Sequence, residues 1–274
     1  MSELNQALKN HYLKEGLYED ILERLKNQNI NLTEVTRSDL SGVDEFHVRG
    51  AQVSRELART TNLEGKTVLD VGCGLGGPCR FLADEYNCIT TGIDLSDAYV
   101  RTATLLSKLV GLENKTNFVQ GDASCLPFDD ESFDAVWTQH VQMNIPDKDT
   151  FYSEIYRVLK PNGYLLYYDI FSTGTQKVSY PMPWAGKEEH SFLVSNLQME
   201  ELVKSLGFSE LDKQDQTPAG IAFFKDFIAK LGLSGPPKLG LNVLMGESTK
   251  PKLFNLYTHL DKGVLMLQSG VFIK

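Results

Sequence analysis

The sequence has few cysteines, no excess of basic residues and no paired metal-binding motif. Its four cysteines, Cys73, Cys79, Cys88 and Cys125, form no Cys-x-x-Cys pair, and structural zinc sites depend on such close pairs. We therefore expect no metal site, and thiols that stay reduced. With 27 Lys and Arg against 36 Asp and Glu, the net charge is −9. A broad basic surface for a polyanion is missing, so we expect no nucleic-acid partner.

Long apolar runs are also missing. No 18 consecutive residues are apolar, so we expect no transmembrane helix. Residues 1–5 lack the basic and then apolar pattern of a secretory signal, and we therefore expect a cytoplasmic protein. A chain of 274 residues that is 42% hydrophobic is long enough to bury one sizeable core with a lid.

The most informative stretch present is the run from Val68 to Gly77. An apolar strand pattern interrupted by Asp70 leads into glycines at positions 72, 74, 76 and 77, and a helical pattern follows from Pro78. Few side chains then separate a ligand from the backbone, and the N-terminus of the helix faces that ligand. The run predicts a nucleotide-type site.

Two classes of nucleotide ligand fit this pattern. Gly72-x-Gly74-x-x-Gly77 satisfies the dinucleotide fingerprint, and Asp94 ends the next strand about 20 residues on, so spacing alone allows a NAD enzyme. Asp70 inside the first strand favours a ligand with a positively charged amino group, which S-adenosylmethionine has and NAD lacks. Asp122 ends a third strand, where it suits an adenine amino group.

The remaining sequence alternates between strand and helix patterns. We expect helices at 78–86, 97–111 and 148–160, and strands at 67–71, 88–93, 116–120, 133–138 and 164–171, which together predict a parallel sheet covered on both faces. Residues 39–44 read as a loop, and 53–61 as a helix. Beyond 172 we expect a helix at 198–206, helical stretches at 223–231 and 252–260, and strands at 208–215 and 264–273.

Asp70, the glycines, Asp94 and Gly121-Asp122 together resemble the successive motifs of class I S-adenosylmethionine-dependent methyltransferases. The resemblance implies an α/β, doubly wound, mostly parallel seven-stranded sheet whose last strand is antiparallel. It implies a helical cap over 1–62 and a methyltransferase domain over 63–274, with lid insertions near 172–196 and 219–262. S-adenosyl-L-methionine is the implied cofactor. The residues assigned to it are His47, Gln52, Asp70, Gly72, Gly74, Gly76, Asp94, Leu95, Asp122, Ala123 and Gln139.

Three further segments, Phe46–Gln52, Gln139–Ile145 and Pro181–Ala185, resemble the sarcosine/dimethylglycine N-methyltransferases, which make glycine betaine. The resemblance implies a small N-methylated glycine as acceptor. Arg49 is then the partner of its carboxylate, and the aromatic faces of Tyr180 and Trp184 favour the quaternary cation. Gln142 and Met143 are further candidates for the acceptor side.

A tertiary amine has no proton to lose after attack, so no dedicated general base is required. His140 and Asn144 are the candidates for a catalytic role. The alternative acceptor is a sterol or quinol methylated at carbon, because those enzymes share the same donor motifs and the region 219–262 is apolar.

Overall fold

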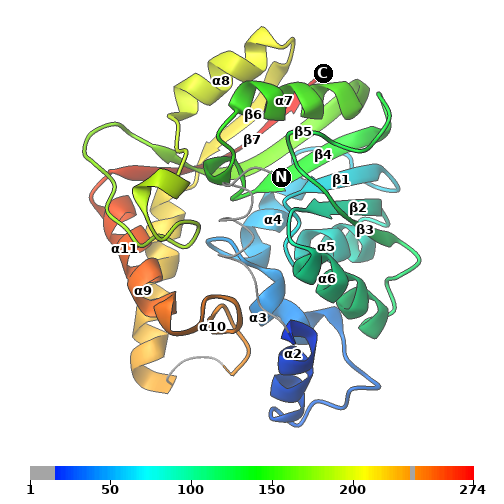
Figure 1. Ribbon diagram of the computed structural model, residues 1–274, viewed down its shortest axis with the longest axis vertical. Helices are drawn as coiled ribbons and strands as arrows, with labels where there is room; N and C mark the ends of the chain where they lie inside the picture. Colours follow the sequence, from blue (N-terminus) through cyan, green and yellow to red (C-terminus); the bar gives the residue numbers. More distant parts are fainter. Residues whose placement is uncertain (1–15, 235–237) are drawn as a thin grey trace.

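In the computed structural model, residues 16–234 and 238–274 are described, with side chains outside 231–234. They form one seven-stranded sheet in the order β3-β2-β1-β4-β5-β7-β6, with helices on both faces (Figure 1). The strands are β1 Thr67–Val71, β2 Ile89–Asp94, β3 Thr116–Gln120, β4 Phe133–Gln139, β5 Leu159–Ser172, β6 Ser209–Asp215 and β7 Leu265–Ile273.

Eight helices of eight or more residues accompany these strands in the described ranges. They are α2 Leu17–Lys26, α4 Ala51–Ala58, α5 Gly77–Glu85, α6 Asp97–Leu109, α7 Lys148–Val158, α8 Asn196–Ser205, α9 Thr217–Ser234 and α11 Thr249–Asp261. Short helical turns lie between them: η1 Arg37–Leu40, α3 Ser41–Asp44, η2 Gln142–Asn144, η3 Glu188–His190, α10 Asn242–Met245 and η4 Gly246–Ser248.

The strand pairing confirms the predicted doubly wound sheet. β1 pairs in parallel with β2 and β4, β2 with β3, and β4 with β5, while β7 runs antiparallel to both β5 and β6. The chain reverses its winding between β1 and β4, so the carboxyl ends of β1 and β4 adjoin at a switch point. Ligands of open α/β sheets bind there.

Each face of the sheet carries its own apolar core. On one face, Trp137, Leu166 and Tyr168 from the strands pack in a cluster with residues of α4, α5, α9 and α11. On the other face, Val136 and Leu165 pack in a cluster with residues of α7 and α8. In Figure 1, α7 and α8 lie above the sheet and α4, α5 and α6 below it. Because both faces are buried at the centre of the sheet, β1, β4, β5 and β7 read as nearly continuous apolar runs, whereas the edge strand β6 is polar and mostly exposed.

The expected loop at 39–44 is wrong. Those residues form the end of η1 and the short helix α3, because their acids make hydrogen bonds and an ion pair within the protein instead of facing solvent. Asp39 accepts hydrogen bonds from the backbone N–H and the hydroxyl of Thr36, a capping arrangement. Asp44 pairs with the buried guanidinium of Arg80, and Leu40 and Val43 pack in a third apolar cluster with α2.

The other expected elements are present, the strands 67–71 and 116–120 with the predicted ends and the rest with shifted ends. Helix 53–61 is α4, two residues earlier at its start, and the stretches at 223–231 and 252–260 are the longer helices α9 and α11. In the described stretch between the end of β5 at Ser172 and the start of α8 at Asn196, η3 is the one helical or strand element, in agreement with the lack of periodicity over 172–196. The division into a cap over 1–62 and a domain over 63–274 stays a prediction, and residues 1–15 of that cap lie outside the described ranges.

Candidate active site

The glycine loop after β1 has the backbone that its sequence predicts. Gly72 and Gly76 adopt φ angles of 75° and 78°, which favour glycine over residues with a Cβ. A Cβ on Gly72 would lie 2.5 Å from Val141 Cγ2, and one on Gly76 would lie 2.5 Å from the Phe118 ring. Both glycines are therefore needed for the loop to approach its neighbours, and α5 begins directly after it.

Asp94, at the end of β2, is bound to the glycine loop. Its Oδ2 accepts a hydrogen bond from the Gly74 N–H at 2.9 Å, and its Oδ1 accepts one from the Ser96 N–H at 2.9 Å. Burial raises the pKa of this carboxyl, and the two N–H groups partly offset that effect. The Ser96 hydroxyl in turn caps α6 by accepting from the Tyr99 N–H, so one short turn fixes both the loop and the helix.

Asp70, inside β1, is almost fully buried. Burial raises its pKa to about 7, and the thiol of Cys79 donates a weak hydrogen bond to its Oδ2 at 3.5 Å. A cation near this carboxylate would favour its ionised form. A strand acid in such a place suits a ligand with a positive amino group.

Asp70, Gly72, Gly74 and Asp94 line a cavity of about 410 Å³ at the carboxyl ends of the strands. It brings together eleven of the residues assigned from the sequence: His47, Asp70, Gly72, Gly74, Asp94, Leu95, Asp122, Ala123, Gln139, His140 and Asn144. Others were not assigned from the sequence: Val43, Asp44, Phe46, Cys73, Leu75, Pro78, Ile93, Ser96, Tyr99, Gly121, Ser124, Val141, Ile145, Pro146 and Leu244.

Most of the unassigned residues flank an assigned one in sequence and could have been found from the strand ends. Tyr99 lies one turn into the helix that follows Asp94, which is a usable signal. Leu244 is different. It comes from α10, more than 100 residues after β4, and only tertiary packing brings it to the cavity.

Seven assigned residues lie outside this lining. The guanidinium of Arg49 donates to both carboxylate oxygens of Glu56, at 2.8 and 2.6 Å, and to Gln216. Gln52 also donates to Glu56, at 3.0 Å. Gly76 faces the ring of Phe118 and is not part of the cavity lining.

The four remaining residues assigned to the acceptor are held by the core or half-buried at its edge. Gln142 is fully buried and donates to the Ile170 carbonyl at 2.8 Å. The Trp184 indole N–H donates to the Ser191 hydroxyl at 2.8 Å, and Met143 belongs to the same apolar cluster. Tyr180 is half-buried and packs against that cluster.

Two histidines stand together at the cavity wall. The rings of His47 and His140 are 6.1 Å apart, and the ring of Tyr168 lies 4.9 Å from that of His140. Burial lowers the pKa of His140 well below its usual value, and the nearby His47 lowers it further. His140 is therefore neutral at pH 7. In the described part of the chain, its buried Nε2 and the buried Oδ1 of Asn144 have no hydrogen-bond partner, so both atoms can receive a ligand.

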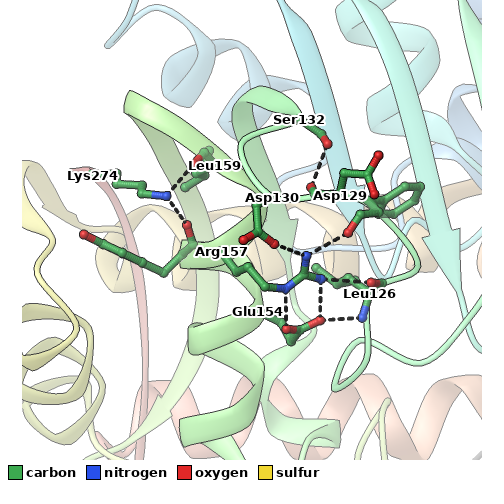
Figure 2. A network of polar contacts seen from close by, with 10 residues as sticks. Leu126, Asp129, Asp130, Ser132, Glu154, Arg157, Leu159 and Lys274 are labelled. Carbon is green, nitrogen blue, oxygen red and sulfur yellow. Dashed lines mark hydrogen bonds and ion pairs between the residues drawn. The ribbon is translucent and has the colours of Figure 1, made fainter.

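A network around Arg157 fixes the loop after β3, which carries Asp122 and Ala123 (Figure 2). Arg157 on α7 donates to Glu154 at 2.7 and 2.8 Å. It also donates to the Leu126 and Phe128 carbonyls, at 3.0 and 2.8 Å. Glu154 then accepts from the Leu126 N–H at 2.8 Å. The charged pair thereby satisfies loop backbone groups that would otherwise need water.

Comparison with known proteins gives the family of the central region. Residues 69–167 match the family model described as Methyltransferase domain. Over 131 residues the chain is 41% identical to a fatty-acid O-methyltransferase of Mycolicibacterium smegmatis, covering 47% of this chain and 46% of that protein. Over 110 residues it is 40% identical to the sterol 24-C-methyltransferase erg6 of Aspergillus fumigatus, covering 40% and 29%. The chain thus spans less than half the length of these relatives.

Solved structures share the fold over more of the chain. A protein of Galdieria sulphuraria, provisionally named a sarcosine dimethylglycine methyltransferase, superposes with a TM-score of 0.66 at 22% identity, covering 82% of this chain and 84% of that one. Its sheet, like this one, belongs to the class I methyltransferase fold. With the family match over β1 to β5, residues 69–167 therefore belong to a methyltransferase domain, and the sheet around them has the fold of the class I S-adenosylmethionine-dependent methyltransferases.

Proposed function

We propose that the chain transfers a methyl group from S-adenosylmethionine to an uncharged, mainly apolar small molecule of the sterol or quinol class. One observation carries this choice of acceptor. None of the described residues that line the cavity is a lysine or an arginine, so a carboxylate or phosphate acceptor would find no cationic partner there.

On the donor side, we assign each acid to one group of the ligand. Asp70 faces the amino group of the methionine moiety, Asp94 accepts hydrogen bonds from the ribose hydroxyls, and Asp122 with Ala123 borders the adenine edge. Leu95 covers the adenine face. Gln139, which is hydrogen-bonded to Ser54 at 3.2 Å, contacts the donor from the end of β4.

On the acceptor side, the wall is apolar with two polar atoms set into it. Phe46, Val141, Ile145, Pro146 and Leu244 supply the apolar surface. Burying a prenyl or ring surface against them is favourable by about 25 cal/mol per Å². Relatives named as a sterol 24-C-methyltransferase and as a 2-methyl-6-phytyl-1,4-hydroquinone methyltransferase support an acceptor of this character.

The bound donor supplies an electrophilic methyl group on a sulfonium. The methyl would pass to the acceptor atom as its carbon–sulfur bond breaks and S-adenosylhomocysteine leaves, and a proton would then be lost from a hydroxyl or from the carbon framework of the acceptor. We assign its acceptance to Nε2 of His140, because His140 lines the cavity and this nitrogen has no other partner in the described chain. Burial lowers the pKa of the ring, so the proton would pass on to solvent once the acceptor has lost it. The Asn144 amide orients the acceptor by a hydrogen bond.

A second candidate acceptor is an N-methylated glycine, with glycine betaine as product. Asp44, Asp70, Asp94 and Asp122 all line the cavity, and an acid-rich wall suits a quaternary cation. In this case Arg49 would have to exchange Glu56 for the substrate carboxylate, and Tyr180 and Trp184 would have to turn toward the acceptor.

A cytoplasmic location stays a prediction. In the described ranges, no helix is long and apolar enough to cross a bilayer.

A methyl-transfer screen separates the two acceptors. The chain is incubated with donor carrying a labelled methyl group and, in turn, a sterol, a prenylated quinol, sarcosine and dimethylglycine. We expect label in the solvent-extractable sterol or quinol product, identified by mass spectrometry. His140→Gln should abolish most of this transfer while S-adenosylhomocysteine still binds in calorimetry. Label only in betaine would replace this proposal with the second candidate.

A further inference from the structure

Helices α9 and α11 expose large apolar side chains to solvent. Phe223 on α9 is 37% exposed, Ile228 on α9 is 44% exposed, and Phe254 on α11 is 61% exposed. The Phe223 ring stacks on that of Phe227, with centroids 6.2 Å apart and an angle of 11°. Single exposed apolar residues are ordinary, but here aromatic side chains recur on two neighbouring helices.

Helices α9 and α11 pack against each other and against the core. Phe224 on α9 is buried, and its ring lies 5.9 Å from that of Tyr257 on α11. Leu256 and Leu260 of α11 reach the core cluster that also contains Phe224. The exposed rings therefore project from elements packed on the sheet.

The charge of this region is opposite to that of the chain as a whole. Residues 217–262 contain six lysines and three acids, although the full chain has a net charge of −9. Lys225 and Lys230 are exposed on α9, and Lys250 is exposed on α11. Lys225 also lies 3.9 Å from the carboxylate of Asp261 on α11, in an ion pair that is exposed to solvent. Exposed aromatic rings and lysines carried on the same helices are a combination by which helices bind the interface of an anionic bilayer.

The same region borders the cavity. Leu244 on α10, which lies between α9 and α11 in sequence, lines the cavity. Residues 239 and 243 pack in the cluster that holds α2 and α3. In Figure 1, α9, α10 and α11 form one group beside the sheet. A partner that binds the surface of α9 and α11 would therefore lie close to the cavity.

We propose that Phe223, Phe227, Ile228 and Phe254, with Lys225, Lys230 and Lys250, form a surface, the α9/α11 surface, that binds an anionic lipid bilayer. Its use rests on the proposed function, because an apolar acceptor is dissolved in membranes and a bilayer-bound enzyme meets it there. The aromatic rings enter the headgroup region and the lysines contact lipid phosphates. Membrane contact of this kind needs no spanning helix.

Co-sedimentation with lipid vesicles tests the proposal. The full chain is mixed with vesicles of phosphatidylcholine alone or of phosphatidylcholine with phosphatidylglycerol. We expect binding to the anionic vesicles that weakens as salt is added. The double variant F223S/F254S should bind at least about tenfold more weakly, since each ring contributes buried apolar area. The matched control is L197S/L211S, because Leu197 and Leu211 are 62% and 54% exposed on α8 and β6; this variant should bind like the unaltered chain.

Three outcomes would overturn the proposal. They are no binding to anionic vesicles, equal loss in both double variants, or a dimer in sedimentation that only F223S/F254S disrupts and that replaces vesicle binding. Methyl transfer to a detergent-solubilised sterol or quinol is measured in parallel. Vesicle binding without methyl transfer would contradict the proposed function alone. Methyl transfer without vesicle binding would contradict only the proposal that the α9/α11 surface binds a bilayer.

Discussion

The carboxylate of Asp94 accepts a hydrogen bond from the backbone N–H of Gly74 across 2.9 Å, so the end of β2 holds the glycine loop of β1. This bond joins two residues that follow separate strands and that the sequence assigns to the same ligand. The second carboxylate oxygen of Asp94 accepts a hydrogen bond from the Ser96 N–H, so the carboxylate is oriented before the methyl donor binds. A carboxylate that is already oriented loses less conformational entropy when a ligand binds to it.

Asp94→Ala should weaken donor binding. Hydrogen bonds to a charged group contribute about 1.5–3 kcal/mol, so the Kd for S-adenosylhomocysteine should rise roughly 10- to 100-fold in calorimetry. Asp97→Ala is the control, because Asp97 is half-exposed and pairs with Arg101 on the surface of α6. Unchanged affinity in a folded Asp94 variant would mean that this carboxylate only caps the turn.

Arg157→Met should loosen the loop after β3 without altering the cavity wall directly. It removes the donors to Glu154 and to two loop carbonyls, each worth about 0.5–1.5 kcal/mol net, so unfolding free energy should fall by about 2–3 kcal/mol. Donor affinity should also fall several-fold, since the loop carries Asp122. Arg101→Met, 68% exposed at its side chain, should change neither quantity. A lower melting temperature with normal donor affinity would separate the loop from the adenine site.

The strand ends were predictable because their signals are local. A glycine that needs positive φ, an acid at a strand end and a capping serine each act within a few residues, and the predicted sheet and most of the predicted donor residues follow from them. Arg49 shows why the acceptor side was harder. Its partners are Glu56, seven residues on, and Gln216, 167 residues on, and no local pattern reveals that a guanidinium is already occupied.

Lys148→Met should affect the acceptor more than the donor. The Lys148 ammonium is buried at the start of α7 and donates to the Ile145 carbonyl and, at 2.8 Å, to that of Phe192. The Phe192 N–H donates to the Met143 carbonyl at 2.8 Å. Lys148 therefore ties the cavity loop at 141–146 to the segment 172–196.

Without this tie, KM for the acceptor should rise about tenfold, roughly the loss of two hydrogen bonds, while the Kd for S-adenosylhomocysteine changes little. Lys187→Met is the control, because Lys187 lies in the same segment with a side chain that is 74% exposed. Equal losses in donor and acceptor binding would indicate a general loss of folding instead of a positioning role.

Asp134 provides a stability test at the opposite end of the strands. Its Oδ2 accepts from the Thr67 N–H at 2.9 Å and from the Thr67 hydroxyl, and its Oδ1 accepts from Lys160 at 3.0 Å. Burial alone would raise the pKa of Asp134, but these bonds outweigh it and lower the pKa to about 2.

Because the folded pKa lies below the unfolded value of 3.8, the ionised group stabilises the fold above about pH 4, and this stabilisation is lost as the pH falls toward 2. Asp134→Asn should therefore cost about 1–2 kcal/mol at pH 7, allowing for solvent screening. In urea titrations, the difference from the unaltered chain should shrink between pH 4 and pH 2. Glu113→Gln, an exposed position, should show no such trend. Donor affinity at pH 7 should be unchanged, because β4 begins at this end and reaches the cavity only at Gln139. A difference that stayed constant with pH would assign the effect to the hydrogen bonds alone and not to the charge.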